Sequence, residues 1–143
     1  DPMNPLFVDT AGWMAAADSK DPLHSECRTV RDEWLEAGGT LITTNYVVDE
    51  TLTLIRMRLG LEAAESWWNQ VSESPRCRVE WITPNREFDA LHGFFTWKDH
   101  AFSFTDCTSF VVMKYLSIEK AMTSDYHFLT AGFDILPATR GRW

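Results

Sequence analysis

Short apolar runs alternate along the chain with longer segments in which apolar residues recur at helical spacing. Each short run ends at a polar or turn residue, which is typical of buried strands. The expected strands are Asn4–Thr10, Leu41–Thr44, Arg78–Thr83, Ala121–Thr123 and Asp134–Leu136. Strands that alternate with helices are joined by right-handed crossovers around a parallel sheet. The alternation therefore predicts an α/β fold with a parallel sheet of four or five strands.

The segments between these strands are expected to be helices. In Leu23–Ala37 the apolar residues repeat every three or four positions until Gly38-Gly39, and they do so again from Tyr46 to Leu59. Asn45 is the expected N-cap of this second helix. The other expected helices are Trp13–Ala17, Leu61–Ser74, Pro84–Lys98 and Ser103–Leu116.

The length of 143 residues is near the commonest size of one domain, so residues 3–143 are expected to form a single domain. Asp1-Pro2, ahead of Met3, resembles a cloning remnant. No apolar run approaches the roughly 20 residues that span a bilayer, and the first residues lack the pattern of a signal peptide. Three cysteines without CxxC spacing are expected to be reduced thiols of a cytoplasmic protein. They are Cys27, Cys77 and Cys107.

The formal net charge is -8. Phosphate contacts normally require clustered Lys and Arg, so this charge argues against a general nucleic-acid-binding surface. A nuclease is still compatible with it, because metal ions held by acidic residues would reverse the sign of the charge at the site.

Four acidic residues fall where an expected strand or turn passes into a helix. They are Asp9, Glu50, Asp106 and Asp125. The carboxyl ends of parallel strands converge on one crevice of an open sheet. Several buried like charges would repel one another unless a cation neutralised them. The pattern predicts a carboxylate site for a divalent metal ion.

Three of these acids also have a structural interpretation. Asp9 and Asp125 occupy turns at which aspartate commonly caps a helix. Asp106 stands three residues after Ser103 and completes the pattern of a capping box. A cap and a ligand are compatible roles if one carboxylate oxygen points into the crevice.

Helical geometry distinguishes Glu50 from its neighbour Asp49. Glu50 shares its side of the helix with Val47 and Leu54, where an unpaired buried acid would be costly without a function. Asp49 belongs to an ordinary solvated face, so Glu50 is the preferred candidate. Asp99 is a further candidate, either as a loop residue or as a supporting partner of the site.

The four histidines show no HExxH motif and no paired spacing, which makes zinc an unfavourable ion for this chain. A site built from carboxylate oxygens suits Mg²⁺ or Mn²⁺. The chain contains no P-loop, no GxGxxG fingerprint and no GxSxG elbow.

The four segments that carry the acids resemble, in order and spacing, the motifs of the PIN-domain family. They are Phe7–Thr10, Asn45–Leu52, Ser103–Phe110 and Thr123–Phe128. The resemblance covers almost the whole chain and is strongest to the short bacterial and archaeal members. Many of these members are the toxins of VapBC-type toxin-antitoxin pairs.

The resemblance implies an α/β/α sandwich with a central parallel sheet and a metal-dependent ribonuclease site. The four acids match the family's acidic quartet, and Thr10 and Ser124 match accompanying hydroxyl positions. Mg²⁺ or Mn²⁺ held by the quartet would activate water for attack on an RNA phosphodiester. An antitoxin protein would be the partner of such a toxin.

Two other classes are alternatives. A phosphatase of the haloacid dehalogenase type also has an Asp at the end of its first strand, but it needs a second Asp where this chain has Ala11. A non-catalytic binding module would use the acids only as helix caps, and metal would leave its thermal stability unchanged.

Two further features concern partners. Adjacent tryptophans on a helix, Trp67-Trp68, cannot easily face one core, so either one of them lies at a homodimer interface or the helix is held between two packed layers. Arg140, Arg142 and Trp143 form a small basic tail that either touches nucleic acid or folds back.

Overall fold

The computed structural model describes residues 3–138, so Asp1-Pro2 and the basic tail lie outside the described residues. Its five strands are all parallel and lie in the order β3-β2-β1-β4-β5. They are β1 (Pro5–Val8), β2 (Thr40–Thr44), β3 (Cys77–Glu80), β4 (Lys120–Met122) and β5 (Asp134–Leu136). The prediction of a parallel sheet of four or five strands is confirmed.

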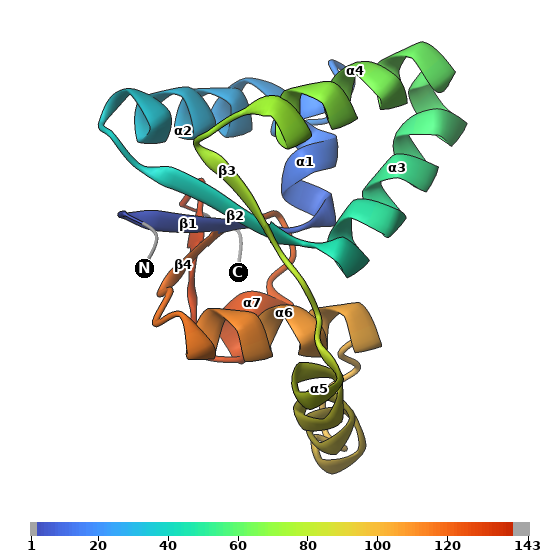
Figure 1. The fold of residues 1–143 in the computed structure, drawn as a ribbon, viewed down its shortest axis with the longest axis vertical. Coiled ribbons are helices and arrows are strands. Elements are labelled where there is room, and N and C mark those ends of the chain that lie inside the picture. Colours follow the sequence, from blue (N-terminus) through green and yellow to red (C-terminus); the bar gives the residue numbers. More distant parts are fainter. Residues whose placement is uncertain (1–2, 139–143) are drawn as a thin grey trace.

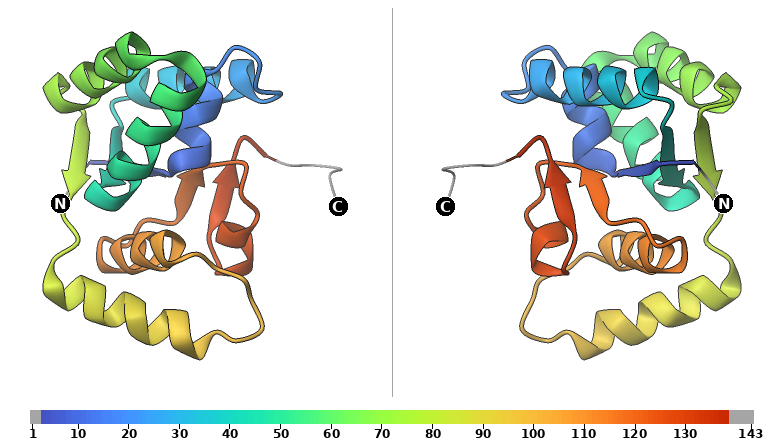
Figure 2. Two further views of the ribbon diagram at one scale, coloured as in Figure 1. Left: turned by 90° about the vertical axis from the view of Figure 1, so that its right-hand side faces the viewer. Right: turned by 90° about the vertical axis from the view of Figure 1, so that its left-hand side faces the viewer.

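Helices cover both faces of this sheet. They are α1 (Thr10–Ala17), α2 (His24–Glu36), α3 (Asn45–Leu59), α4 (Leu61–Glu73), α5 (Pro84–Thr96), α6 (Phe104–Tyr115) and α7 (His127–Thr130). The helices α1 to α4 lie on one side of the sheet, and α6 and α7 lie on the other (Figure 1). Helix α5 packs against α6 on the side away from the sheet (Figure 2). The architecture is therefore an α/β/α sandwich.

The central strands are apolar because both of their faces are covered. Leu6, Phe7 and Val8 of β1 have no exposed surface, and all five residues of β2 are buried. On the α6 and α7 side, the ring of Phe110 packs against that of Phe128 with centroids 5.0 Å apart. Among residues 3–138, no helix combines the length and the hydrophobicity needed to cross a bilayer.

The strand order reverses between β1 and β4. From β1 the chain crosses over to β2 on one side, whereas β4 pairs with the other edge of β1. Val8 is in register with Met122, so both strands end at the same level. A crevice at the carboxyl ends of strands flanking such a switch point is the usual ligand site of an open parallel sheet.

Several expected element boundaries were wrong, and three of the differences have a clear structural cause. Helix α1 begins at Thr10 rather than Trp13, directly after β1. The N-cap of α3 is Thr44, whose Oγ1 accepts from the amide of Val47 at 3.1 Å. Asn45 instead accepts from the amide of Ile82 at 2.7 Å, a tertiary contact that no local propensity predicts. Strand β3 ends at Glu80, because Thr83 is the N-cap of α5.

Gly12 allows α1 to lie directly on the end of β4. A Cβ atom at Gly12 would lie 2.1 Å from the carbonyl oxygen of Met122. This atom belongs to the backbone of β4, so relief of the clash would require the helix and the strand to separate. The glycine therefore fixes the distance between the residues that follow β1 and those that follow β4.

We expect Gly12→Ala to destabilise the protein by about 3 kcal/mol, because the added methyl group overpacks a backbone contact. Helix propensity alone would stabilise the variant by up to about 1 kcal/mol. The sign of the change in unfolding free energy, measured by urea denaturation, thus separates the two effects. A variant as stable as the parent protein would contradict the close approach of α1 and β4.

Candidate active site

A cavity of about 480 Å³ opens at the carboxyl edge of the sheet, beside the switch point between β1 and β4. We call it the acidic pocket. The residues predicted for the site that line it are Asp9, Thr10, Glu50, Asp106, Ser124 and Asp125. They come from the ends of β1 and β4 and from the helices α1, α3 and α6. Side chains up to 116 positions apart in the chain are thereby brought to one cavity.

Asp9 is the most deeply buried of the four acids and is 6% exposed. Its Oδ1 accepts from the amide of Gly12 at 3.0 Å, so it caps α1, and its Oδ2 accepts from Thr123 Oγ1 at 2.9 Å. Burial raises its pKa to about 7, and the nearby charges of Asp125 and Asp106 act in the same direction. The two hydrogen bonds lower the pKa but do not offset burial. The carboxylate of Asp9 therefore needs positive charge beside it to be fully ionised at neutral pH.

Asp106 is both a helix cap and a pocket residue. The hydroxyl of Ser103 accepts from the amide of Asp106 at 2.9 Å, and Asp106 Oδ2 accepts from the amide of Ser103 at 3.2 Å. The same Oδ2 lies 3.4 Å from His127 Nδ1. Burial, followed by the charge of Asp125, raises the pKa of Asp106. The capping box thus fixes one carboxylate group at the wall of the pocket.

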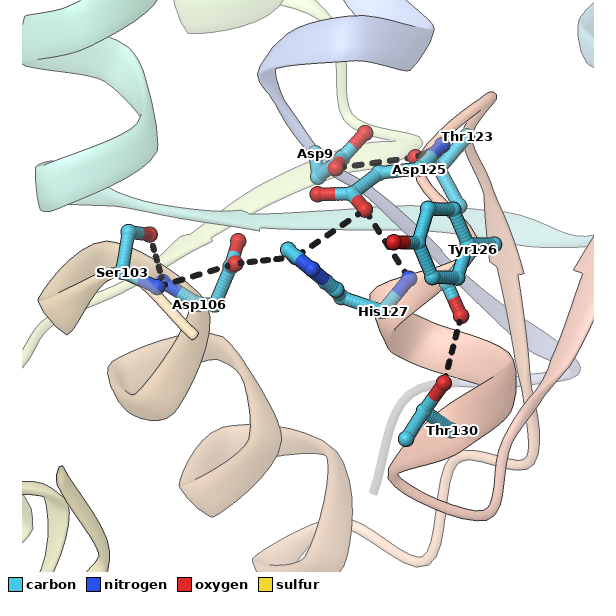
Figure 3. A network of polar contacts seen from close by, with 8 residues as sticks. All are labelled: Asp9, Ser103, Asp106, Thr123, Asp125, Tyr126, His127 and Thr130. Carbon is cyan, nitrogen blue, oxygen red and sulfur yellow. Dashed lines mark hydrogen bonds and ion pairs between the residues drawn. The ribbon is translucent and has the colours of Figure 1, made fainter. Parts of the chain in front are cut away.

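Asp125 and His127 form a compact turn after β4. Asp125 Oδ1 accepts from the amide of His127 at 2.9 Å and lies 3.3 Å from His127 Nδ1. One ligand atom each from Asp106, Asp125 and His127 lie within 4.8 Å of one another. Figure 3 shows the imidazole ring between the two carboxylate groups. The expectation of a carboxylate site stays a prediction, and the structure adds an imidazole nitrogen beside two of the acids.

Thr123 connects the two halves of the site. It has no exposed surface, its hydroxyl donates to Asp9, and the same oxygen accepts from the amide of Asp125 at 2.8 Å (Figure 3). Ser124, the hydroxyl residue singled out from the sequence, is exposed and lines the pocket. Thr123 is thus the hydroxyl residue that positions two of the acids.

Glu50 lines the acidic pocket, whereas Asp49 does not. The expectation that Glu50 is buried was wrong, because its side chain is exposed at the mouth of the pocket. The apolar neighbours Val47 and Leu54 do line the same wall of α3. Asp99 lies in an exposed turn between α5 and α6 and is not among the residues that line the pocket.

Further polar or charged residues line the pocket that the sequence did not assign to the site, namely Asp21, Arg58, Ser103, Thr105, Ser109 and His127. His127 follows Asp125 by two positions in the turn after β4. Arg58 and Ser109 are at helical spacing from the predicted acids, eight residues after Glu50 and three after Asp106. Extending the helical spacing beyond the acids themselves would have found both.

The donor set of the pocket fits a hard divalent cation. The carboxylate groups supply oxygen ligands of the kind that Mg²⁺ and Mn²⁺ favour. The buried hydroxyl groups of Thr10 and Ser109, which also line the pocket, have no hydrogen-bond partner among the described residues. Such groups are costly when unpaired, and an ion with its water shell would satisfy them. The acids and the unpaired hydroxyl groups therefore indicate the same kind of occupant.

The fold and the pocket define an α/β protein with a carboxylate site at the switch point of a parallel sheet. No protein-family model matches the chain. The 23S rRNA-specific endonuclease VapC20 from two strains of Mycobacterium tuberculosis is 34% identical over 128 residues. This match covers 90% of this chain and 95% of VapC20.

Solved structures show the same relationship. The crystal structure of M. tuberculosis VapC20, described as a sarcin-ricin loop cleaving toxin, matches 90% of this chain and 95% of that one with a TM-score of 0.81 and 32% identity. The structure of FitAcB from Neisseria gonorrhoeae has a TM-score of 0.66 at 13% identity over 91% of this chain and 95% of that one, which shows a shared fold. The chain therefore belongs to the VapC-like family of PIN-domain toxins.

Proposed function

We propose that this protein is a metal-dependent endoribonuclease that hydrolyses RNA phosphodiester bonds in the acidic pocket. The observation that carries the proposal is the convergence of four acids from separate segments on one cavity. They are Asp9, Glu50, Asp106 and Asp125. Membership of the VapC-like family supports the same chemistry.

We further propose that these four acids hold Mg²⁺ or Mn²⁺. When bound, such an ion polarises a phosphate oxygen and makes a water molecule more acidic. Thr123 keeps Asp9 and Asp125 in a fixed relation through its two hydrogen bonds. The capping box holds the carboxylate group of Asp106, and His127 Nδ1 lies 3.4 Å from a carboxylate oxygen of Asp106 and 3.3 Å from one of Asp125.

The proposed substrate is ribosomal RNA. VapC20, whose name specifies 23S rRNA, is 34% identical to this chain over almost its full length. A chain with a net charge of -8 attracts RNA only where its surface charge is locally reversed, and bound cations would do so at the acidic pocket.

The proposal is tested by incubating the pure protein with purified 23S rRNA in Mn²⁺, in Mg²⁺ and in EDTA. We expect discrete cleavage products with either metal and none in EDTA. Each ion is also expected to raise the melting temperature, because it binds only the folded pocket. Intact RNA under all three conditions, together with an unchanged melting temperature, would favour a non-catalytic binding module.

We also propose a cytoplasmic location and an antitoxin protein as partner, on the strength of family membership. A homodimer is the proposed assembly state. Trp67 is 7% exposed and packs edge-on against Trp13 with centroids 5.5 Å apart, whereas Trp68 is 37% exposed. Light scattering should therefore give about twice the 16.5 kDa of one chain. A monomer at high protein concentration would contradict this assembly.

A further inference from the structure

Arg58 is the one lysine or arginine among the described residues that lines the acidic pocket. The acids that line it are Asp9, Asp21, Glu50, Asp106 and Asp125. Arg58 is exposed, and its side chain forms no ion pair with another residue of 3–138. A guanidinium group that faces several acids yet pairs with none of them is free to receive an anion from solution.

The position of Arg58 follows from the geometry of α3. Glu50, Leu54 and Arg58 are one helical turn apart on the same face, and all three line the pocket. Arg58 therefore lies about 12 Å along the axis from Glu50, and its side chain tilts back towards the start of the helix. Arg58 therefore lines the pocket further along α3 than Glu50, and it forms no ion pair with Asp106 or Asp125.

We infer that Arg58 binds a phosphate of the RNA strand next to the bond that is cleaved and so aligns the strand across the acids. This inference rests on the proposed function. Ions at the four acids would neutralise the scissile phosphate, but a neighbouring phosphate still meets the charge of Asp21, the lining acid outside that set. The fork of an arginine makes two parallel charge-assisted hydrogen bonds to one phosphate, which fixes both position and orientation.

Arg56 provides a matched control. Both arginines lie in the last turn of α3, where a positive charge is favourable to the helix dipole, and both are exposed. Arg56 does not line the acidic pocket. Removing either side chain changes the net charge by the same amount. A difference in cleavage between Arg58→Ala and Arg56→Ala therefore arises from the location of Arg58 at the pocket and not from the loss of one charge.

The experiment measures steady-state cleavage of purified 23S rRNA at saturating Mn²⁺ over a range of KCl concentrations. Arg58→Ala is expected to raise KM about tenfold at low salt, which is the loss of one charge-assisted contact, while kcat changes little. The slope of log(kcat/KM) against log[KCl] should fall by about one unit. Arg58→Lys should restore the slope, since the charge is kept. It should reverse only part of the rise in KM, since lysine lacks the planar fork of arginine.

These readouts separate binding from a structural role, which would shift the melting temperature without changing the salt slope. If Arg58→Ala has the KM and salt slope of Arg56→Ala, the inference is overturned while the nuclease proposal stands. If the unaltered protein leaves the RNA intact, the proposed function fails and this inference fails with it.

Discussion

The variant Asp9→Asn is expected to lose metal-dependent RNA cleavage by at least about a thousandfold while it stays folded. Asparagine keeps an oxygen that can accept from the Gly12 amide, so the cap of α1 survives. The negative charge at the deepest wall of the pocket is lost, and with it one proposed ligand. Cleavage of 23S rRNA in Mn²⁺ measures the first effect, and circular dichroism checks the fold.

Asp99→Asn is the control for this loss. It removes the same charge from an exposed turn that does not line the acidic pocket. We expect it to cleave RNA like the parent protein. Equal loss in both variants would point to the net charge of the chain, and full activity of Asp9→Asn would remove Asp9 from the proposed site.

Without metal, the stability of Asp9→Asn relative to the parent protein is expected to increase by about 3 kcal/mol as the pH rises from 5 to 8. Asp9 titrates near 3.8 in the unfolded chain, whereas burial raises its pKa in the folded protein to about 7. Between these values the folded state binds the extra proton, so its stability falls as the pH rises towards 7 and is constant above it. The raised pKa of Asp106 acts with the same sign.

Urea denaturation in EDTA at pH 5 and pH 8 measures this difference. The variant mimics the protonated acid, because it has no charge to bury at either pH. Addition of Mn²⁺ at pH 8 should reverse the order of stability, because the parent protein alone keeps all four acids. A constant difference between the two proteins across this pH range would show that burial does not perturb Asp9.

Local sequence patterns were sufficient for most of the fold. The buried strands have continuous apolar runs, and the helices have apolar residues at spacings of three and four, so neighbouring residues alone indicate each element. The boundary errors arose where a tertiary contact decided the cap. Asn45 has the preferred chemistry of an N-cap, yet its side chain is used to hold the segment after β3.

The sequence predicted the four acids of the candidate site, but not their burial or the hydrogen bonds that connect them. Each acid follows a strand or begins a helix, and parallel strands place such positions at one edge, which is a rule of topology. The burial of Asp9, the exposure of Glu50 and the distance of Asp99 from the pocket depend on how the helices pack.

The sequence by itself determined a parallel α/β sheet and the four acids at the ends of its elements, because hydrophobic periodicity and turn chemistry are local properties of the chain. Tertiary structure alone decided that Thr123 joins Asp9 to Asp125, and that His127 lies between two carboxylate groups. It also decided that Arg58 faces the acids. The hydrogen bond from Thr123 to Asp9 spans 114 positions, and its geometry is set by the register of β1 with β4 rather than by any spacing along the chain.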